Sequence, residues 1–211
     1  MAKTAEFPKL KRNLVAILRG LKPQDALAYG QAIFEAGIEA IEVPLNSPDP
    51  FASIATLARE LPKSALVGAG TVLTADDVDR LNEAGGRLLV SPNIDADVMR
   101  RAADHKMVTM PGVFTPSEAF LALKLGASAL KFFPAGVLGA KGIAAIKAVL
   151  PKDAIIGAVG GVSEKDFADY KSAGVTAFGL GSSLFTLALS VDEVAARAGA
   201  AVEAYDRVFA S

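Results

Sequence analysis

Short apolar runs alternate with longer amphipathic segments along the whole chain. Each run is apolar at almost every position, which is typical of parallel strands that are buried on both faces. Glycine, proline or charged residues end each run. The predicted strands are residues 14–18, 40–43, 65–69, 87–90, 107–110, 127–132, 154–158 and 176–180.

The segments between these runs have helical periodicity and carry helix start and stop signals. Thr115-Pro116-Ser117-Glu118 has the pattern of a capping box, and Thr74 precedes two aspartates that suit the positive end of a helix. Glycines follow several segments, where a left-handed cap residue is favoured. The predicted helices are residues 23–37, 49–61, 74–84, 95–104, 115–125, 140–150, 163–172, 182–189 and 191–209.

Eight strand–helix units predict a parallel sheet, because each parallel connection needs a crossover of helical length. We expect an α/β fold in which the units close into a (β/α)8 TIM barrel, with residues 1–211 forming a single domain. An open, doubly wound sheet is the structural alternative.

Composition narrows the chemistry that this barrel could perform. The net charge of −1 gives no reason to expect nucleic acid or an anionic membrane as a partner. The chain has no cysteine and a single histidine, His105, so thiolate chemistry and multi-histidine metal sites are excluded. No apolar run reaches transmembrane length, and residues 1–12 lack an apolar signal core, so we expect a soluble cytoplasmic protein.

Lys131 interrupts the apolar run Ala129–Pro134. Strand alternation points Leu130 and Phe132 outwards and Lys131 into the barrel. One interpretation is a lysine that extends its amine to water or pairs with a carboxylate. The other is an amine whose pKa is lowered by burial, so that it attacks a carbonyl and forms a Schiff base.

Glu42 has the same inward position in the run Ala40–Val43. A carboxylate inside a barrel is costly unless it is paired or protonated. It could form a structural ion pair with Arg19 or Lys131, or it could transfer protons beside the lysine. Lys131 and Glu42 together are more specific than either residue alone.

Glycines and hydroxyl groups follow the last two predicted strands. Gly160-Gly161 and Gly181-Ser182 offer backbone N–H groups, and a predicted helix begins at Ser182. Phosphate sites of barrels recur at this location. The glycines could also serve only to make tight turns.

Two further polar residues follow strands on the same rim. Arg19 could form a bidentate pair with a carboxylate. Thr71 could hydrogen-bond a substrate or cap a turn, and the residues alone do not decide between these roles.

Three segments resemble one family. Leu130-Lys131-Phe132-Phe133-Pro134, Glu42 and Gly68-Ala69-Gly70-Thr71-Val72-Leu73 are similar to motifs of the class I KDPG/KHG aldolases. The resemblance implies a (β/α)8 barrel that usually forms homotrimers and needs no metal or organic cofactor. It also implies that Lys131 forms the imine and that Glu42 is the general acid and base.

Within the family, Ile17–Gly20, Glu42–Pro48 and Ala158–Val162 most resemble members acting on 2-dehydro-3-deoxy-6-phospho-D-galactonate. The resemblance implies reversible cleavage to pyruvate and D-glyceraldehyde 3-phosphate, with Arg19 and Thr71 at the carboxylate. Val159 is the candidate for distinguishing C4 epimers. The epimeric gluconate derivative is the alternative substrate. A phosphosugar isomerase or epimerase and a phosphometabolite sensor are the alternative functions.

Overall fold

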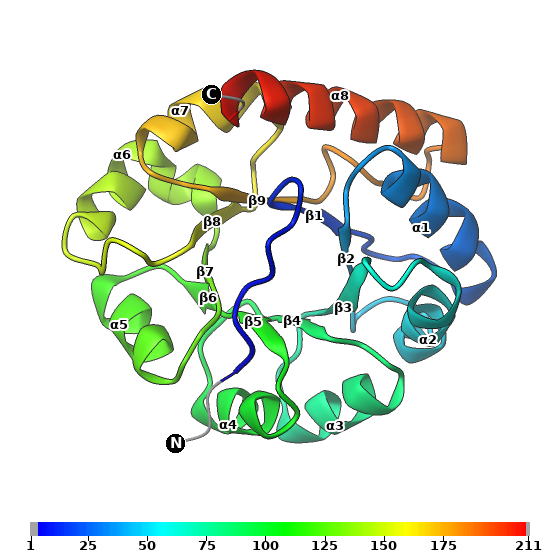
Figure 1. Ribbon diagram of the computed structural model, residues 1–211, viewed down its shortest axis with the longest axis horizontal. Coiled ribbons are helices and arrows are strands. Elements are labelled where there is room, and N and C mark those ends of the chain that lie inside the picture. The colour runs from blue at the N-terminus through cyan, green and yellow to red at the C-terminus, as the bar shows by residue number, and fades with distance from the viewer. Residues whose placement is uncertain (1–3, 210–211) are drawn as a thin grey trace.

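The computed structural model describes residues 4–209 as a ring of parallel strands surrounded by helices (Figure 1). Every paired strand runs parallel to its neighbour. The strands are β1 (Leu14–Ile17), β2 (Ala40–Pro44), β3 (Leu66–Gly70), β4 (Leu88–Val90), β5 (Val108–Met110), β6 (Gly112–Val113), β7 (Leu130–Phe132), β8 (Ile156–Val159) and β9 (Ala177–Leu180).

The nine strands correspond to the eight predicted runs, because only Pro111 separates β5 from β6. Proline has no N–H and breaks the ladder. Both pieces bond to the segment around β7: the N–H of Ala129 donates to the carbonyl of Thr109 in β5 (3.0 Å), and the N–H of Phe133 donates to that of Val113 in β6 (3.1 Å). These bonds close the ring, and the predicted barrel is confirmed.

Helices cover the outside of the ring and lie close to their predicted positions. The capping box at Thr115 and Glu118 is formed, and the Thr74 hydroxyl accepts a hydrogen bond from the N–H of Asp77 (3.1 Å). The α-helices are α1 (Ala26–Glu35), α2 (Pro50–Glu60), α3 (Ala75–Glu83), α4 (Ala96–Asp104), α5 (Pro116–Lys124), α6 (Ala135–Lys147), α7 (Phe167–Ser172) and α8 (Val191–Phe209), with 3-10 helices η1 (Pro23–Asp25) and η2 (Glu164–Asp166).

The predicted helix over residues 182–189 is wrong. Gly181 begins a single turn, in which its carbonyl accepts a hydrogen bond from the N–H of Phe185 (2.9 Å), and no helix forms within residues 182–189. Tertiary contacts hold the segment instead. The Tyr29 hydroxyl donates to the carbonyl of Leu189 (2.6 Å), and the Tyr29 ring packs edge-on against Phe185.

The start of α6 also differs from its prediction. The helix begins at Ala135 rather than near residue 140, and it contains a break at Gly139, where φ is 70° and ψ is 163°. A left-handed φ of this kind favours glycine. Because Gly139 interrupts the helix, the helical periodicity after it does not extend back to the first turn at Ala135.

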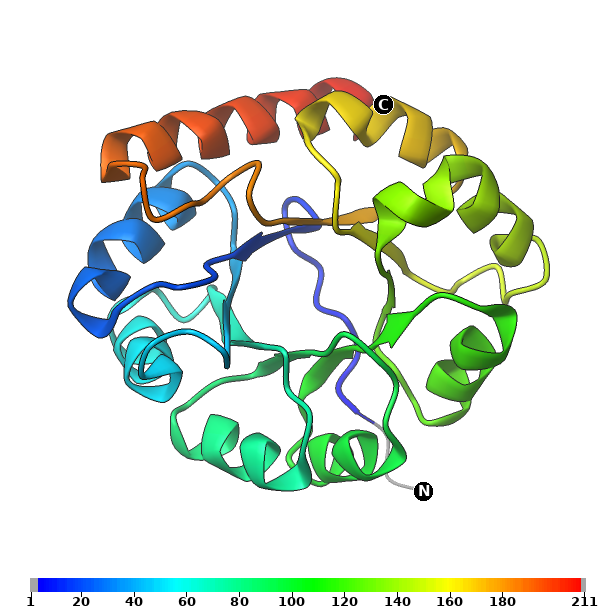
Figure 2. The ribbon, with the colours of Figure 1, turned by 180° about the vertical axis from the view of Figure 1, so that it is seen from behind.

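Strand alternation divides the apolar residues into two cores. Leu130, Phe132 and other outward residues pack between the sheet and the helices. Inward residues fill the barrel near the start of the strands, where Phe7 and Leu10 of the N-terminal segment join them. That segment crosses one end of the ring, and Figure 2 shows the molecule from the opposite side. The end of the barrel where the strands begin is therefore filled.

Within residues 4–209, no helix combines the length and apolar content that a membrane span requires.

Candidate active site

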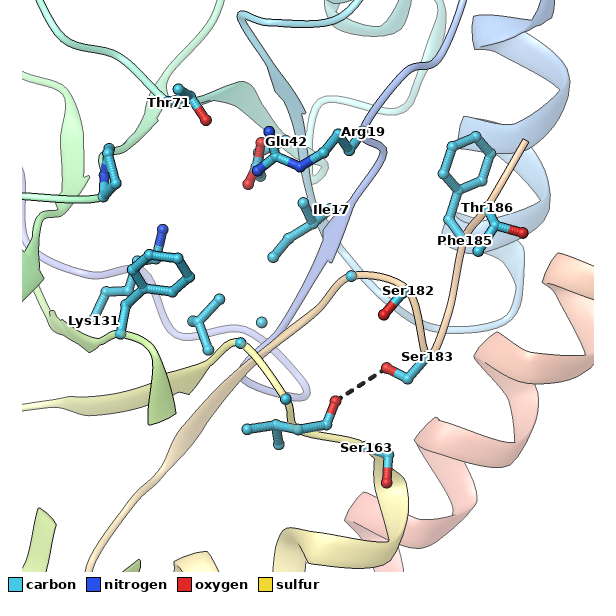
Figure 3. Close-up of a pocket in the computed structure, with 18 of the residues that line it drawn as sticks. Ile17, Arg19, Glu42, Thr71, Lys131, Ser163, Ser182, Ser183, Phe185 and Thr186 are labelled. Atoms are coloured by element: carbon cyan, nitrogen blue, oxygen red, sulfur yellow. Dashed lines mark hydrogen bonds between the residues drawn. The ribbon is translucent and has the colours of Figure 1, made fainter. Parts of the chain in front are cut away.

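A cavity of about 960 Å³ opens at the end of the barrel where the strands finish (Figure 3). It brings together every residue that the sequence singled out for a site. These residues are Arg19, Glu42, Thr71, Lys131, Val159, Gly160, Gly161, Gly181 and Ser182. Their contributions to catalysis or binding remain predictions.

Lys131 and Glu42 face the cavity from β7 and β2. Both are buried, with relative exposures of 6% and 2%. No ion pair within 4.0 Å joins Glu42 to Lys131 or to Arg19 in the described chain, so the structural ion pair, one of the two interpretations, is not formed. Glu42 Oε2 is buried without a hydrogen-bond partner among residues 4–209. An acceptor left in this state is available to a reacting group.

Burial moves the pKa values of both groups towards neutrality. It raises the pKa of Glu42 to about 7, although the positive charges of Lys131 and Arg19 oppose the shift. It lowers the pKa of Lys131 to about 8, although the charge of Glu42 opposes that shift. A neutral amine and a carboxyl that exchanges its proton therefore coexist near pH 7 to 8.

Two glycines of the segment Gly68–Thr71 make room for this arrangement. A Cβ atom on Gly70 would lie 2.0 Å from Glu42 Oε2, and one on Gly68 would lie 1.8 Å from the carbonyl oxygen of Leu88. Both distances are far shorter than van der Waals contact. The two glycines thus let β3 approach both the buried carboxylate of Glu42 and the backbone of β4. This packing explains the glycines without a bound dinucleotide.

Thr71 has a strained backbone at the edge of the cavity. Its φ is 57°, a left-handed value that β-branched residues rarely adopt. Its hydroxyl makes no hydrogen bond with another described residue, so it does not cap a turn. These observations favour substrate contact among the two expected roles.

Thr71→Gly is expected to lower kcat/KM for the sugar-acid cleavage that the family resemblance implies. The expected decrease is about tenfold, the effect of losing one hydrogen bond of about 1.5 kcal/mol to a charged group. The melting temperature should not fall, because glycine accepts the left-handed backbone without strain. Steady-state kinetics and thermal unfolding measure both effects. Thr71→Ser keeps the hydroxyl and serves as the control, and full activity of Thr71→Gly would contradict the assignment.

Arg19 lies over the mouth of the cavity and is held by the loop after β2. Its Nη1 donates a hydrogen bond to Asn46 Oδ1. The N–H of the next residue, Gly20, donates to Ser47 Oγ (2.9 Å). Asn46 and Ser47 therefore orient the loop that carries the arginine.

The loops after β8 and β9 present several unpaired N–H groups. Those of Gly160, Gly161, Ser182 and Ser183 donate no hydrogen bond to any residue between 4 and 209. Ser183 Oγ donates to the carbonyl of Val162 (3.1 Å) and joins the two loops (Figure 3). Because no helix begins at Ser182, an anion would be bound by loop N–H groups rather than by a helix dipole.

Arg197 of α8 supports the second loop from outside. Its Nη1 lies 3.4 Å from the carbonyl oxygen of Ser182 and 3.3 Å from that of Ser183, and it donates to both. A guanidinium in this position stabilises the outward orientation of these carbonyls.

Phe133, which from the sequence could line the pocket or merely pack, also lines the cavity, as do Ile17 and Gly179, which are not singled out from the sequence. The Phe133 ring centroid lies 4.6 Å from Lys131 Nζ. Ile17 and Gly179 have the same inward parity as Glu42, so alternation along their strands could have revealed them. No group of three or more potential metal ligands occurs among residues 4–209.

Known proteins are similar to this chain in both sequence and fold. Residues 8–204 match the family described as KDPG and KHG aldolase. A probable 2-dehydro-3-deoxy-6-phosphogalactonate aldolase of Rhizobium meliloti (strain 1021) is 57% identical over 96% of each chain. The 2-dehydro-3-deoxy-6-phosphogalactonate aldolase of Escherichia coli (strain K12) is 46% identical over 92% of this chain and 95% of its own. A solved structure described as native KDPGal superposes with a TM-score of 0.93 at 44% identity, covering 99% of this chain and 100% of the other. The chain belongs to the KDPG and KHG aldolase family.

Proposed function

We propose that the protein cleaves 2-dehydro-3-deoxy-6-phospho-D-galactonate reversibly to pyruvate and D-glyceraldehyde 3-phosphate through a Schiff base on Lys131. The observation that carries the proposal is a buried lysine with a lowered pKa that shares a cavity with a buried carboxyl. The identities of 57% and 46% to the two relatives named for this substrate support the choice of sugar acid.

The neutral amine of Lys131 attacks the C2 ketone, and the carbinolamine loses water to give an iminium. The C3–C4 bond then breaks, and its electron pair moves towards the iminium nitrogen to form an enamine. Glu42 accepts the C4 hydroxyl proton, so that C4 becomes the aldehyde carbon. Protonation of C3 and hydrolysis of the imine release pyruvate and restore the lysine.

The two charged ends of the substrate fit opposite sides of the cavity. Arg19 and Thr71 bind the carboxylate, and Arg19 supplies the paired N–H donors that a carboxylate accepts. The N–H groups after β8 and β9, including those of Gly160, Gly161 and Ser182, bind the phosphate. These contacts fix C2 beside Lys131 and the C4 hydroxyl beside Glu42.

Trapping with pyruvate and borohydride tests the covalent step. The intact mass of the wild-type protein is expected to increase by one reduced pyruvyl group, and peptide mapping should place it on Lys131. An isomerase, an epimerase or a non-catalytic sensor gives no such adduct. Absence of the adduct, or its survival in Lys131→Ala, would refute the mechanism.

Val159→Thr tests the choice of epimer. Val159 is buried at the end of β8 and offers a hydroxyl no partner, whereas threonine of similar shape can bond one. The ratio of kcat/KM for the galactonate over the gluconate epimer is expected to fall about tenfold. Val137→Thr, at a site on α6 that is 76% exposed, is the control. An unchanged ratio in Val159→Thr would exclude Val159 from the discrimination.

We also propose that the protein is a homotrimer, as the resemblance to the family implies. Exposed apolar side chains on α5 support an interface, since Phe120 and Leu121 are 47% and 42% exposed. Light scattering should give three times the chain mass of 21.7 kDa. A monomer mass would refute this part of the proposal.

A further inference from the structure

Five consecutive strands join the two buried ionisable groups. Around the barrel, β2, β1, β9, β8 and β7 follow one another. Glu42 and Lys131 lie on the first and last of these strands. The three strands between them face the cavity with Ile17, Gly179 and Val159, which we call the apolar arc. Figure 3 shows Ile17 between Glu42 and the loop that carries Ser182.

Ile17 and Val159 both lie close to Gly179. A Cβ atom on Gly179 would lie 2.7 Å from Val159 Cγ2 and 3.2 Å from Ile17 Cδ1, so both side chains close over the glycine. Gly179 pairs directly with Val159 across β8 and β9. It is not among the glycines with positive φ, so packing rather than backbone conformation requires the absence of a side chain.

The apolar arc lies along the path that the substrate must take. This step rests on the proposed function, in which C2 is bonded to Lys131 and the phosphate occupies the loops after β8 and β9. The intervening carbons C3 to C5 then pass over β8 and β9, and Ile17 on the neighbouring β1 borders the same path next to Gly179. Hydroxyls pointing towards the apolar arc find no hydrogen-bond partner, whereas those pointing away can reach Glu42.

We propose that Ile17 and Gly179 act with Val159 as a stereochemical filter for the carbon chain of the sugar acid. Ile17 is a second specificity-determining side chain, and Gly179 lets the two side chains meet in a continuous apolar surface. A hydroxyl of the wrong configuration loses its water without gaining a partner. The site thereby rejects the epimer instead of only favouring the substrate.

The Ile17 series tests the filter directly. Ile17→Thr keeps a β-branched side chain in β1 but adds a hydroxyl, and Ile17→Val keeps the surface apolar. The ratio of kcat/KM for the galactonate over the gluconate epimer is expected to fall about tenfold in Ile17→Thr and to change less than about twofold in Ile17→Val.

Gly179→Ala tests the shape of the apolar arc. Its methyl group must displace Val159, so kcat/KM for the six-carbon substrate is expected to fall about tenfold or more. Pyruvate has only three carbons and does not extend over the apolar arc, so its borohydride adduct should still form. Gly199→Ala on α8, where a Cβ atom would meet nothing within 4 Å, is the matched control.

The outcomes separate this inference from the function on which it rests. If the wild-type protein cleaves neither epimer, the proposed function and the filter both fail. If the wild-type protein is selective but Ile17→Thr keeps its ratio, the filter alone is overturned. Loss of the pyruvate adduct in Gly179→Ala would show a general defect of the site and would also overturn the role given to Gly179. The Ile17 series decides the matter if Gly179→Ala does not fold.

Discussion

Lys131→Met is expected to lower kcat/KM by about 10⁴-fold or more, as removal of a nucleophile does in other covalent enzymes. Methionine has a similar length and no amine, so no iminium can form and no electron sink exists for C3–C4 cleavage. Lys131 is buried on β7, and methionine fills a similar volume, so the replacement should preserve the fold. Steady-state kinetics and borohydride trapping measure the effect.

Lys141→Met is the matched control, because Lys141 is an exposed lysine of α6. It should react with pyruvate and borohydride as the wild-type protein does. The pKa of Glu42 should rise further above its ordinary value in Lys131→Met, since the charge of Lys131 lowers it. Substantial turnover by Lys131→Met with an intact fold would contradict covalent catalysis.

Glu42→Gln is expected to lower kcat by about 10² to 10⁴-fold, the usual contribution of a general acid or base. Glutamine fills the same space beside Gly70 but cannot accept the C4 hydroxyl proton. The rate of C3–C4 cleavage should fall by a larger factor than the affinity for pyruvate. Single-turnover cleavage compared with pyruvate affinity separates the two effects, and a kcat near the wild-type value would contradict the assigned role.

The pH dependence of borohydride trapping with pyruvate measures how the charges of Glu42 and Arg19 influence the pKa of Lys131. Only the neutral amine attacks, so the wild-type trapping rate should rise with pH through a pKa of about 8. The charge of Glu42 raises the pKa of Lys131 and that of Arg19 lowers it. The midpoint should therefore move to lower pH in Glu42→Gln and to higher pH in Arg19→Met. Equal midpoints in all three proteins would contradict the coupling.

The sequence predicts the fold because local signals and burial agree along the chain. The barrel and the membership of the KDPG and KHG aldolase family are both confirmed. The inward positions of Glu42 and Lys131 follow from the two-residue period of a strand, and the structure has both in one cavity. The helix cap at Thr115 could also be predicted from the sequence, because it depends only on residues within one turn.

The remaining features depend on contacts between distant segments. The pattern of apolar residues over 182–189 predicts a helix, but the segment forms turns and is bonded through Leu189 to Tyr29 of α1. The strain at Thr71 and the packing over Gly179 cannot be read from neighbouring residues either. Tertiary structure outweighs local propensity at these positions, and most of them line the cavity.

The N-terminal segment that fills the barrel leaves the opposite end as the place where substrate and products pass. Phe7 and Leu10 pack against the inner core at the end where the strands begin, and the cavity is lined by residues at the end where the strands finish. In the proposed mechanism the aldehyde is held after cleavage only by non-covalent contacts, whereas the three-carbon fragment is still bonded to Lys131. The phosphorylated aldehyde therefore departs first, and pyruvate follows once the imine is hydrolysed. In the reverse direction pyruvate must enter before the aldehyde, so product inhibition by pyruvate should be competitive with the sugar acid.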